Sequence, residues 1–375
     1  MSTTTSTTTS EALKLQTEPP QGKITYGKLR YIPAGHTPKA SPHNFHLPEL
    51  SEFSDVRRLP LHNLRPVPSN KDLPTATNHA QLATHGFTAV HHPVSMHATP
   101  YTLDSWKDPK LLRELYIPET EELVKAVTGC SAVATSDLLL RSQLWTESDA
   151  LATHAGHGKD EDKTAAQLAR EEELSALETG FPQFIGFNPA QGGASPAPKI
   201  HLDYAPNGAR AHVRMYHPKL MEAAKDAIAA EDNLLAQGKA LKDSYVNSEG
   251  PRWALYSIWR PLKPVKRDPL ALGDTRTFAD EDYVTVKIKT PNLGDGREGT
   301  HEAESYVARY SEGHRWHWIE DMTPEEVFII GLWDSNKEND GGCSAGGTLH
   351  SSVELEGKEN EEARESIELR CLAIW

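Results

Sequence analysis

Short apolar segments separated by turn-forming residues fill the second half of the chain. Each is rich in Val, Ile, Leu, Trp or Tyr, and Pro, Gly, Asp or Asn lies between most of them. Such segments predict β-strands, and several in succession predict an antiparallel sandwich or barrel. The predicted strands lie within residues 252–262, 282–289, 304–310, 314–319, 326–335, 348–355 and 365–375.

The first half of the chain mixes strand patterns with helix patterns. A helix is predicted over 118–129, because Pro118 suits its first turn, acidic residues follow, and Gly129 can end it. The stretch 217–245 is rich in Ala, Leu, Lys and Glu and predicts the longest helix, whereas PNGA (206–209) predicts a turn. Strand patterns occur at 23–32, 85–93 and 130–145.

Composition also suggests where ordered structure begins. Residues 1–22 are rich in Thr and Ser and predict a disordered tail, and the highly charged stretch 154–180 predicts a solvated insertion or a short helix. The remainder, 23–375, predicts a single domain. Within it, a wrapping and helical part (23–195) precedes a β-rich core (196–375).

Charge and cysteine content narrow the partners and the compartment. The chain has a net charge of −14 and no long basic cluster, so nucleic acid and anionic membranes are disfavoured as partners. Cys130, Cys343 and Cys371 lie far apart and are odd in number, which indicates reduced thiols and a cytoplasmic protein. Neither a secretory signal pattern nor an apolar stretch of membrane-spanning length is visible. The oligomeric state is left open.

The last predicted strand carries chemistry on one face. Alternation along a strand places four polar residues on that face, namely Arg364, Ser366, Glu368 and Arg370. A guanidinium beside a hydroxyl is a good receptor for a carboxylate, since its planar donors can bind both oxygens. The alternative is a solvated strand face with ordinary ion pairs.

Two separated patterns predict a metal site. In His201-Leu202-Asp203, the histidine and the aspartate project from one face of a strand. Chance alone predicts about two to three His-x-acid triplets in a chain of this composition, so the triplet is not specific by itself. However, His350 lies in a later strand pattern and precedes Arg364. Two neutral imidazoles and one carboxylate hold Fe(II) while leaving three positions for a chelating cosubstrate and O₂.

Other motifs compete with this interpretation. GCSAG (342–346) matches a nucleophile elbow centred on Ser344, which would make the protein a serine hydrolase. An Asn/Asp/Gly loop before it and a strand pattern after it disfavour that alternative. The histidines within 84–97 lack a carboxylate at strand or helix spacing and are expected at the surface or in loops, and those within 314–318 are expected to pack or to line a pocket.

Four segments of the second half are similar to one known family. They are HLDYAPNGA (201–209), YSIWRPLKPVKRDPLALGDTRTF (256–278), HRWHWIEDMTPEEVFIIGLWDS (314–335) and ARESIELRCLAIW (363–375). The chain resembles the fungal gibberellin desaturase-like and AsaB-like hydroxylase/desaturase proteins, which are related to the cephalosporin 7-alpha-methoxylase component. The resemblance runs from about residue 80 to the end. Leu349 stands where relatives commonly have Pro, and Ser257 stands where they have Asn.

The resemblance implies a fold and an activity. The expected fold is α+β, with a double-stranded β-helix (jelly-roll) core, flanking helices and a long N-terminal extension. The expected activity is that of a non-heme oxygenase of fungal secondary metabolism that uses Fe(II), 2-oxoglutarate and O₂. It would oxidise an unactivated C–H bond of a small molecule by hydroxylation, desaturation or ring closure such as aziridine formation. The sequence does not choose among terpenoid acids, polyketides and amino-acid-derived substrates.

The resemblance also assigns residues. His201, Asp203 and His350 would bind the metal, and Arg364 and Ser366 would anchor the cosubstrate. Candidates for a second carboxylate contact, or else for structural ion pairs, are Arg260 and Arg141. Candidates for the pocket wall, or else for the core, are Tyr204, Tyr256, Trp259 and Trp316.

One further alternative is a jelly-roll binding protein that keeps the fold without turnover. The presence of all three metal ligands and of the Arg-x-Ser pair favours the enzyme. The helical stretch 217–245 would either cap the site or pack against the rest of the protein.

Overall fold

The computed structural model describes most of the chain. Ser344, Cys343, the predicted tail and all but the last residue of the predicted charged insertion lie outside the described part. Among the described helices, none is both long and apolar enough to cross a membrane. The described residues are 24–42, 44–65, 79–144, 180–187, 194–246, 249–294, 296–337 and 345–375.

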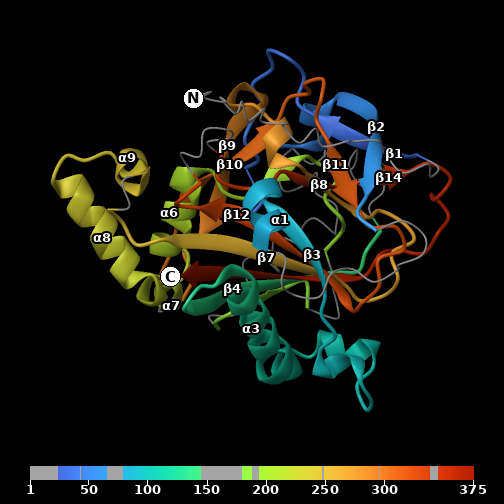
Figure 1. Cartoon of the computed structure of the whole chain (residues 1–375), viewed down its shortest axis with the longest axis horizontal. Coiled ribbons are helices and arrows are strands. Elements are labelled where there is room, and N and C mark those ends of the chain that lie inside the picture. The colour runs from blue at the N-terminus through green and yellow to red at the C-terminus, as the bar shows by residue number, and fades with distance from the viewer. Residues whose placement is uncertain are drawn as a thin grey trace, which may run out of the picture.

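Two β-sheets form the centre of the protein, and helices lie on their outside (Figure 1). The strands are β1 (Thr25–Tyr31), β2 (Asp55–Asn63), β3 (Phe87–His91), β4 (Ala132–Arg141), β5 (Gln183–Ile185), β6 (His201–Leu202), β7 (Trp253–Pro261), β8 (Leu270–Gly273), β9 (Tyr283–Pro291), β10 (Thr300–Ala308), β11 (Trp316–Trp318), β12 (Glu326–Asp334), β13 (His350–Ser352), β14 (Glu354–Leu355) and β15 (Ser366–Ile374). The helices are α1 (His79–His85), α2 (Pro109–Leu111), α3 (Ile117–Thr128), α6 (Pro206–Met215), α7 (Pro218–Ala223), α8 (Lys225–Ala236) and α9 (Leu241–Val246).

The sheets draw strands from the whole described chain. The larger sheet has the order β14-β1-β2-β11-β8-β13-β6-β10-β9, and the smaller has the order β3-β12-β7-β15-β4-β5. Most neighbours are antiparallel, as the sequence predicts, but β2 pairs parallel with β11 and β4 pairs parallel with β5. The N-terminal part is therefore woven into both sheets, since β1 and β2 belong to one and β3, β4 and β5 to the other.

The smaller sheet has one apolar face and one face that carries polar side chains. On β15, Ile367 and Leu369 belong to the same core cluster as the α3 side chains Leu123 and Val124. Figure 1 shows α3 on the side of this sheet that faces away from β1 and β2. Burial of each such aliphatic side chain stabilises the fold by about 1.5–3 kcal/mol. The opposite face, with Glu368, faces the larger sheet, so the predicted division of this strand is confirmed.

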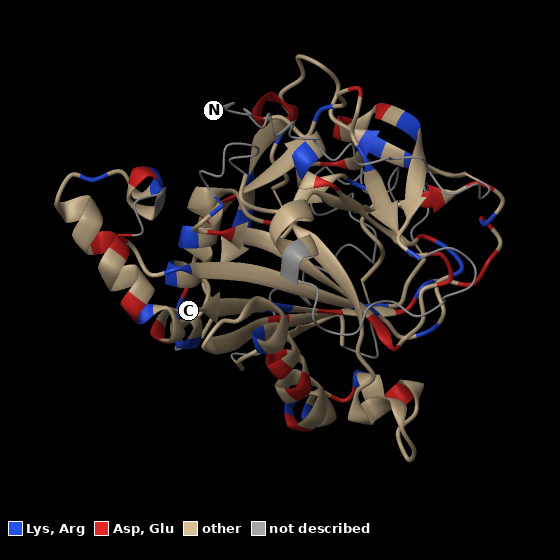
Figure 2. Ribbon diagram, in the orientation of Figure 1, with Lys and Arg blue, Asp and Glu red and all other residues tan. Residues whose placement is uncertain are grey.

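The helices are confirmed where their end signals are strong. α3 ends at Gly129, whose φ of 74° is a left-handed conformation that glycine adopts without strain. The stretch 217–245 is helical, but it forms α7, α8 and α9 instead of one helix, with a second left-handed glycine, Gly238, after α8. These helices lie beside the sheets (Figure 1), which identifies them as packing helices. Figure 2 shows both signs of charge on the outer helices α3 and α8.

A buried carboxylate ties this helical layer to the smaller sheet. Glu231 of α8 has no exposed surface and forms ion pairs with Arg210 and Arg214 of α6. It also accepts hydrogen bonds from the Tyr245 hydroxyl at 3.0 Å and from the Trp253 indole at 3.1 Å. Because several hydrogen-bond and ion-pair partners from different elements bind this one carboxylate, Glu231 fixes α6 against the sheets.

One local prediction is wrong, and two strands lie where the sequence predicts none. PNGA does not form a turn; it starts α6, because Pro206 occupies the first helical position, where its fixed φ is already helical. β2 lies in a Pro- and His-rich stretch whose pattern predicts little regular structure. β8 has four buried residues and no alternation that would predict a strand on its own.

Gly208 allows α6 to approach β10 closely. A Cβ at this position would lie 1.8 Å from the carbonyl oxygen of Glu304. We expect Gly208→Ala to lower the free energy of unfolding by about 1–3 kcal/mol, because the backbone of α6 must move away. Urea unfolding of the purified variant measures this loss. Met215→Ala, at an exposed position of the same helix, is the control, and equal midpoints for the two variants would contradict the prediction.

Candidate active site

Two adjacent strands of the larger sheet carry the predicted metal ligands. His350 of β13 pairs directly with His201 of β6, and their ring centroids are 4.3 Å apart. Asp203 follows β6 at once, and ligand atoms of all three residues lie within 4.8 Å of one another. Both histidines are buried and Asp203 is half-buried. Among the described residues, this is the one group of three or more His, Cys, Asp or Glu that could hold a metal ion.

Both histidines are oriented by backbone carbonyls. The Nδ1 atom of His201 donates to the carbonyl of Lys199 at 2.6 Å, and Nδ1 of His350 donates to the carbonyl of Thr348 at 3.1 Å. This fixes the proton on Nδ1 and leaves Nε2 as a ligand atom. Burial, followed by the neighbouring His350, lowers the pKa of His201 to about 3. The ring of His201 is therefore neutral at physiological pH, as a metal ligand must be.

The two oxygens of Asp203 face different groups. Oδ1 lies 3.6 Å from Nε2 of His201, and Oδ2 lies 3.1 Å from Nε of Arg370. Burial raises the pKa of Asp203, but Arg370 and the two histidines together lower it by more than burial raises it. The pKa of Asp203 therefore lies below its usual range. Asp203 is thus a carboxylate with one oxygen directed at the histidines and the other at a fixed cation.

Arg370 forms ion pairs with three carboxylates. Besides Asp203, it approaches Glu368 at 3.0 Å and Asp137 at 3.5 Å. The β15–β4 pairing shifts register next to Arg370, so that Arg370 faces Asp137 and the following Cys371 faces Thr135. Irregularities of this kind are common beside active sites because they re-aim a side chain. Here the irregularity lies where Asp137 meets Arg370.

A close backbone approach helps to place His350. A Cβ at Gly347 would lie 2.3 Å from the carbonyl oxygen of Leu332 on β12. Glycine is therefore required for the chain to run this close to the smaller sheet just before β13. The same segment continues into Thr348, whose carbonyl orients the imidazole of His350.

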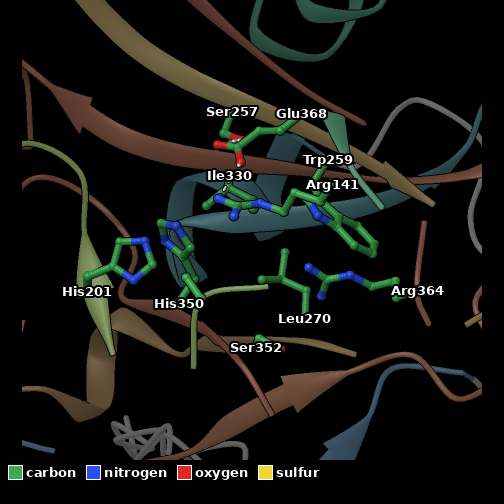
Figure 3. A pocket seen from close by; sticks show the side chains of 11 residues that line it. Arg141, His201, Ser257, Trp259, Leu270, Ile330, His350, Ser352, Arg364 and Glu368 are labelled. Atoms are coloured by element: carbon green, nitrogen blue, oxygen red, sulfur yellow. Dashed lines mark hydrogen bonds and ion pairs between the residues drawn. The ribbon is translucent and has the colours of Figure 1, made fainter. Parts of the chain in front are cut away.

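The predicted carboxylate receptor lies beside the metal ligands. Figure 3 shows His201 and His350 together, with Arg141, Trp259 and Arg364 beyond His350 in the same narrow cavity. Arg364 donates from Nη1 to the carbonyl of Asp268 at 2.6 Å, and its guanidinium lies over the Trp259 ring at 5.1 Å. Burial, then the nearby Arg141, lowers the pKa of Arg364 to about 9, so that it remains a cation at neutral pH.

Two polar atoms of this receptor lack a partner within the described part of the chain. Nε of Arg364 and Oγ of Ser366 are both buried and accept or donate no hydrogen bond there. A buried, unsatisfied donor is costly unless a ligand satisfies it. A bound carboxylate would satisfy donors of this kind.

Arg141 lies where two cavities meet. It faces Ser366 across the β4–β15 pairing, donates to the carbonyl of Ser195 at 2.6 Å and lies 3.8 Å from Glu368. Its side chain lines the narrow cavity and also a larger cavity of about 340 Å³. The predicted wall residues divide between the two, with Trp259 in the narrow cavity and Tyr204 in the larger one.

The structure places three other predicted wall or contact residues elsewhere. Tyr256 and Arg260 have even numbers on β7 and therefore point away from Trp259, to the face that α3 covers. There Arg260 donates to the carbonyls of His92 and Pro324. Trp316 lies in a separate core cluster and donates to the Tyr31 hydroxyl at 2.8 Å.

Sequence reasoning missed several residues of the site. Alternation places Glu368 and Arg370 on the correct face, but the contact of Arg370 with Asp203 depends on how the two sheets meet. Asp137 and His212 line the larger cavity, and no local pattern marks either residue. Long-range packing brings them to the site.

Comparisons with known proteins identify the family. A family model described as "Oxidoreductase/YMDC permease-like domain" matches residues 62–374. The chain is 38% identical to oxidoreductase chry3 of Gibberella zeae, over 93% of this chain and 98% of that protein. It is 35% identical to the gibberellin cluster GA4 desaturase of Gibberella fujikuroi, over 81% of this chain and 85% of that protein. The chain belongs to this family of fungal oxidoreductases. The resemblance to the hydroxylase/desaturase proteins is thereby confirmed.

Solved structures are similar in fold. The iron and alpha-ketoglutarate-dependent endoperoxidase NvfI aligns with a TM-score of 0.55 and 19% identity, over 93% of this chain and 98% of that chain. This chain is a relative of the hydroxylase/desaturase proteins and contains the group of His201, Asp203 and His350. It is therefore an Fe(II)- and 2-oxoglutarate-dependent oxygenase that uses O₂.

The cluster around Arg370 yields a stability prediction. Arg370→Gln leaves Asp137, Asp203 and Glu368 without their shared cation, so the metal-free protein should lose about 3–5 kcal/mol of unfolding free energy. A divalent metal should then stabilise the variant more than the wild type, because it supplies positive charge beside Asp203. Thermal unfolding with and without Fe(II), under anaerobic conditions, measures both effects.

Two variants complete this test. Arg370→Lys keeps the charge and should retain part of the stability, whereas Arg57→Gln removes a half-exposed arginine that pairs with Asp55 and should change little. A metal-free Arg370→Gln protein as stable as the wild type would show that the cluster is not a structural tie.

Proposed function

We propose that the protein oxidises an unactivated C–H bond of a small organic molecule in fungal secondary metabolism. His201, Asp203 and His350 would hold Fe(II), and Arg364 with Ser366 would bind the far carboxylate of 2-oxoglutarate. The observation that carries the proposal is the position of the buried, incompletely satisfied Arg364 in the same cavity wall as His201 and His350, with Ser366, whose buried Oγ has no partner among the described residues, two positions further along the chain. The finer description of the fold, a double-stranded β-helix within a single domain, belongs to the same proposal.

The donor set fits the proposed groups. Two imidazole nitrogens and one carboxylate oxygen suit Fe(II) and leave positions for a bidentate cosubstrate and O₂. When bound, the iron would activate O₂ as the oxidant, and 2-oxoglutarate would supply two of the electrons as it is oxidised to succinate and CO₂. The protein's own residues would bind and orient the cosubstrate and shield it from solvent. Arg364 neutralises the far carboxylate, Trp259 covers its guanidinium, and Leu270 with Ile330 lines the cavity with apolar surface.

Arg141 is a second candidate anchor for the cosubstrate. Its position opposite Ser366 and beside Arg364 lets its guanidinium reach the same anion from the other side. Glu368 balances its charge, which limits the repulsion between two neighbouring arginines. Hydroxylation, desaturation and ring closure all remain compatible with this arrangement, and the named relatives include a desaturase and hydroxylase/desaturases.

Metal content tests the proposed ligands. Anaerobically purified protein should bind one Fe(II) per chain and, with 2-oxoglutarate, show the weak visible band of an iron–2-oxoglutarate chelate. His201→Ala and His350→Ala should each lose most of the bound iron and all of the band, because two ligands hold the ion poorly. Elemental analysis and absorption spectra measure this. His314→Ala, a histidine paired with Asp282 outside the site, is the control, and unchanged iron in either ligand variant would refute the assignment.

Cosubstrate affinity tests the receptor. Arg364→Gln should raise the KM for 2-oxoglutarate by about tenfold to a hundredfold, since it removes a charge-assisted contact, and Ser366→Ala should raise it less. Iron content should stay unchanged in both, which separates anchoring from metal binding. Succinate release measures turnover. Iron and 2-oxoglutarate binding without any succinate release across small-molecule substrates would favour the non-catalytic binding protein instead.

A further inference from the structure

The cavity of about 340 Å³ opens on the metal ligands from the side opposite the Arg364 receptor. His201 and Asp203 both form part of its wall, whereas His350 and Arg364 line only the narrow cavity. The two cavities share His201, Ala197 and Arg141. A molecule in the larger cavity would therefore lie beside the metal while the cosubstrate occupies the narrow one.

The charged groups of this wall already have partners within the protein. Asp137 and Asp203 both lie on Arg370, and Arg141 binds the Ser195 carbonyl and approaches Glu368. Farther out, the ammonium of Lys199 donates to the carbonyl of Pro48 at 2.7 Å, and Glu49, which also lines the wall, interacts with other groups of the protein as well. A carboxylate or ammonium group on a ligand in this cavity would have to compete with these contacts, and with the cosubstrate for Arg141, and a buried charge without a partner is strongly unfavourable.

A neutral polar strip lies on the α6 side of the cavity. Tyr204, His212 and Tyr216 stack in series, with ring centroids 4.8 Å and 4.5 Å apart. Nε2 of His212 is 3.4 Å from the Tyr204 hydroxyl, a long contact that a ligand can replace. Burial, then Arg370, lowers the pKa of His212 to about 3, so its imidazole is neutral and can donate or accept one hydrogen bond.

The remaining wall is mostly apolar. Leu139 of β4, Ile288 of β9 and Ala303 of β10 face the cavity together with Phe45 and Leu47 of the N-terminal part. A single small amino acid would leave much of the space unfilled, and its two charges would meet the paired groups described above. The cavity instead suits a compact ring system that buries apolar surface.

We propose that this cavity binds the molecule that is oxidised, and that this molecule is neutral, compact and largely apolar. A size of roughly 15–25 non-hydrogen atoms fits a cavity at the lower end of the usual range for small ligands. A hydroxyl, carbonyl or amide group of the molecule hydrogen-bonds to His212. This inference rests on the proposed function, because it assumes that Fe(II) and 2-oxoglutarate occupy the neighbouring positions.

Matched pairs of neutral and acidic probes test the substrate class. The full-length protein is loaded anaerobically with Fe(II) and 2-oxoglutarate, and the visible band of the chelate is followed during titration. The probes are abietinol with abietate, indole-3-ethanol with indole-3-acetate, and the amino acids L-valine and L-tryptophan. We expect each alcohol to bind at least about tenfold more tightly than its acid, and abietinol to bind most tightly, because the acid must lose its hydration without gaining a partner.

The outcomes separate this inference from the proposed function. Absence of the chelate band in the wild-type protein would contradict the proposed function itself. A normal band that no alcohol shifts, or that the acids or amino acids shift at equal or lower concentration, would overturn only the inference drawn from the cavity.

Paired variants locate the binding site. Ala303→Phe fills the larger cavity and should weaken abietinol binding at least about tenfold without changing 2-oxoglutarate binding, whereas Leu270→Phe fills the narrow cavity and should do the reverse. His212→Phe keeps the aromatic stack but removes the hydrogen bond, so a loss of about fivefold to tenfold is expected. His212→Gln should recover part of it.

Glu302→Phe is the matched control for these variants. Glu302 neighbours Ala303 on β10 but is exposed, so the same new side chain should leave both ligands unaffected. Abietinol binding unchanged in Ala303→Phe would show that the molecule binds elsewhere, and binding unchanged in His212→Phe would remove His212 from the contact. The chelate band of each variant verifies that the site is intact.

Discussion

The ion cluster on Arg370 is the interaction on which the site depends. It joins Asp137 and Glu368 of the smaller sheet to Asp203, which follows a strand of the larger sheet. Desolvating four charged groups is costly, and that cost is offset only when every member finds its partner. The sheets therefore have one favourable separation and register at this point. The same contact that fixes the sheets also fixes one oxygen of Asp203, a proposed metal ligand.

Strand β15 organises the chemistry by position along one face. Ser366 belongs to the proposed cosubstrate receptor, Glu368 lies between Arg141 and Arg370, and Arg370 reaches Asp203. Alternation keeps Ile367 and Leu369 on the other face, under α3. A single buried strand thus holds part of the proposed cosubstrate anchor and the support of a proposed metal ligand at a fixed spacing, which a loop could not guarantee.

Local sequence rules recovered what depends on local geometry. Periodicity found nearly every strand after residue 252, and the Pro118 and Gly129 signals found α3. They failed where tertiary contacts decide: β2 is held by pairing with β1 and β11, and β8 by pairing with β11 and β13. The grouping of His201, Asp203 and His350 was foreseeable from ligand chemistry, but their separation was not, because it depends on the pairing of β6 with β13.

The residues that were wrongly expected in the site, or not expected there, also divide into those that local geometry can predict and those that tertiary packing decides. Alternation along β7 places the side chains of Arg260 and Trp259 on opposite faces of the strand. The sequence alone could therefore have predicted that Arg260 does not belong to the site. The residues of the cavity wall could not be predicted in this way, since the wall combines α6, β4, β9, β10 and residues of the N-terminal part that are distant along the chain.

Charge pairing inside the wall of the larger cavity has a functional consequence. Because Arg370 binds carboxylates of the protein and Arg141 is the second candidate anchor of the cosubstrate, the α6 side of the larger cavity offers a ligand neutral hydrogen-bonding groups, while the narrow cavity retains the incompletely satisfied Arg364. The two cavities are therefore chemically different, and an anionic cosubstrate and a neutral substrate would not compete for the same place.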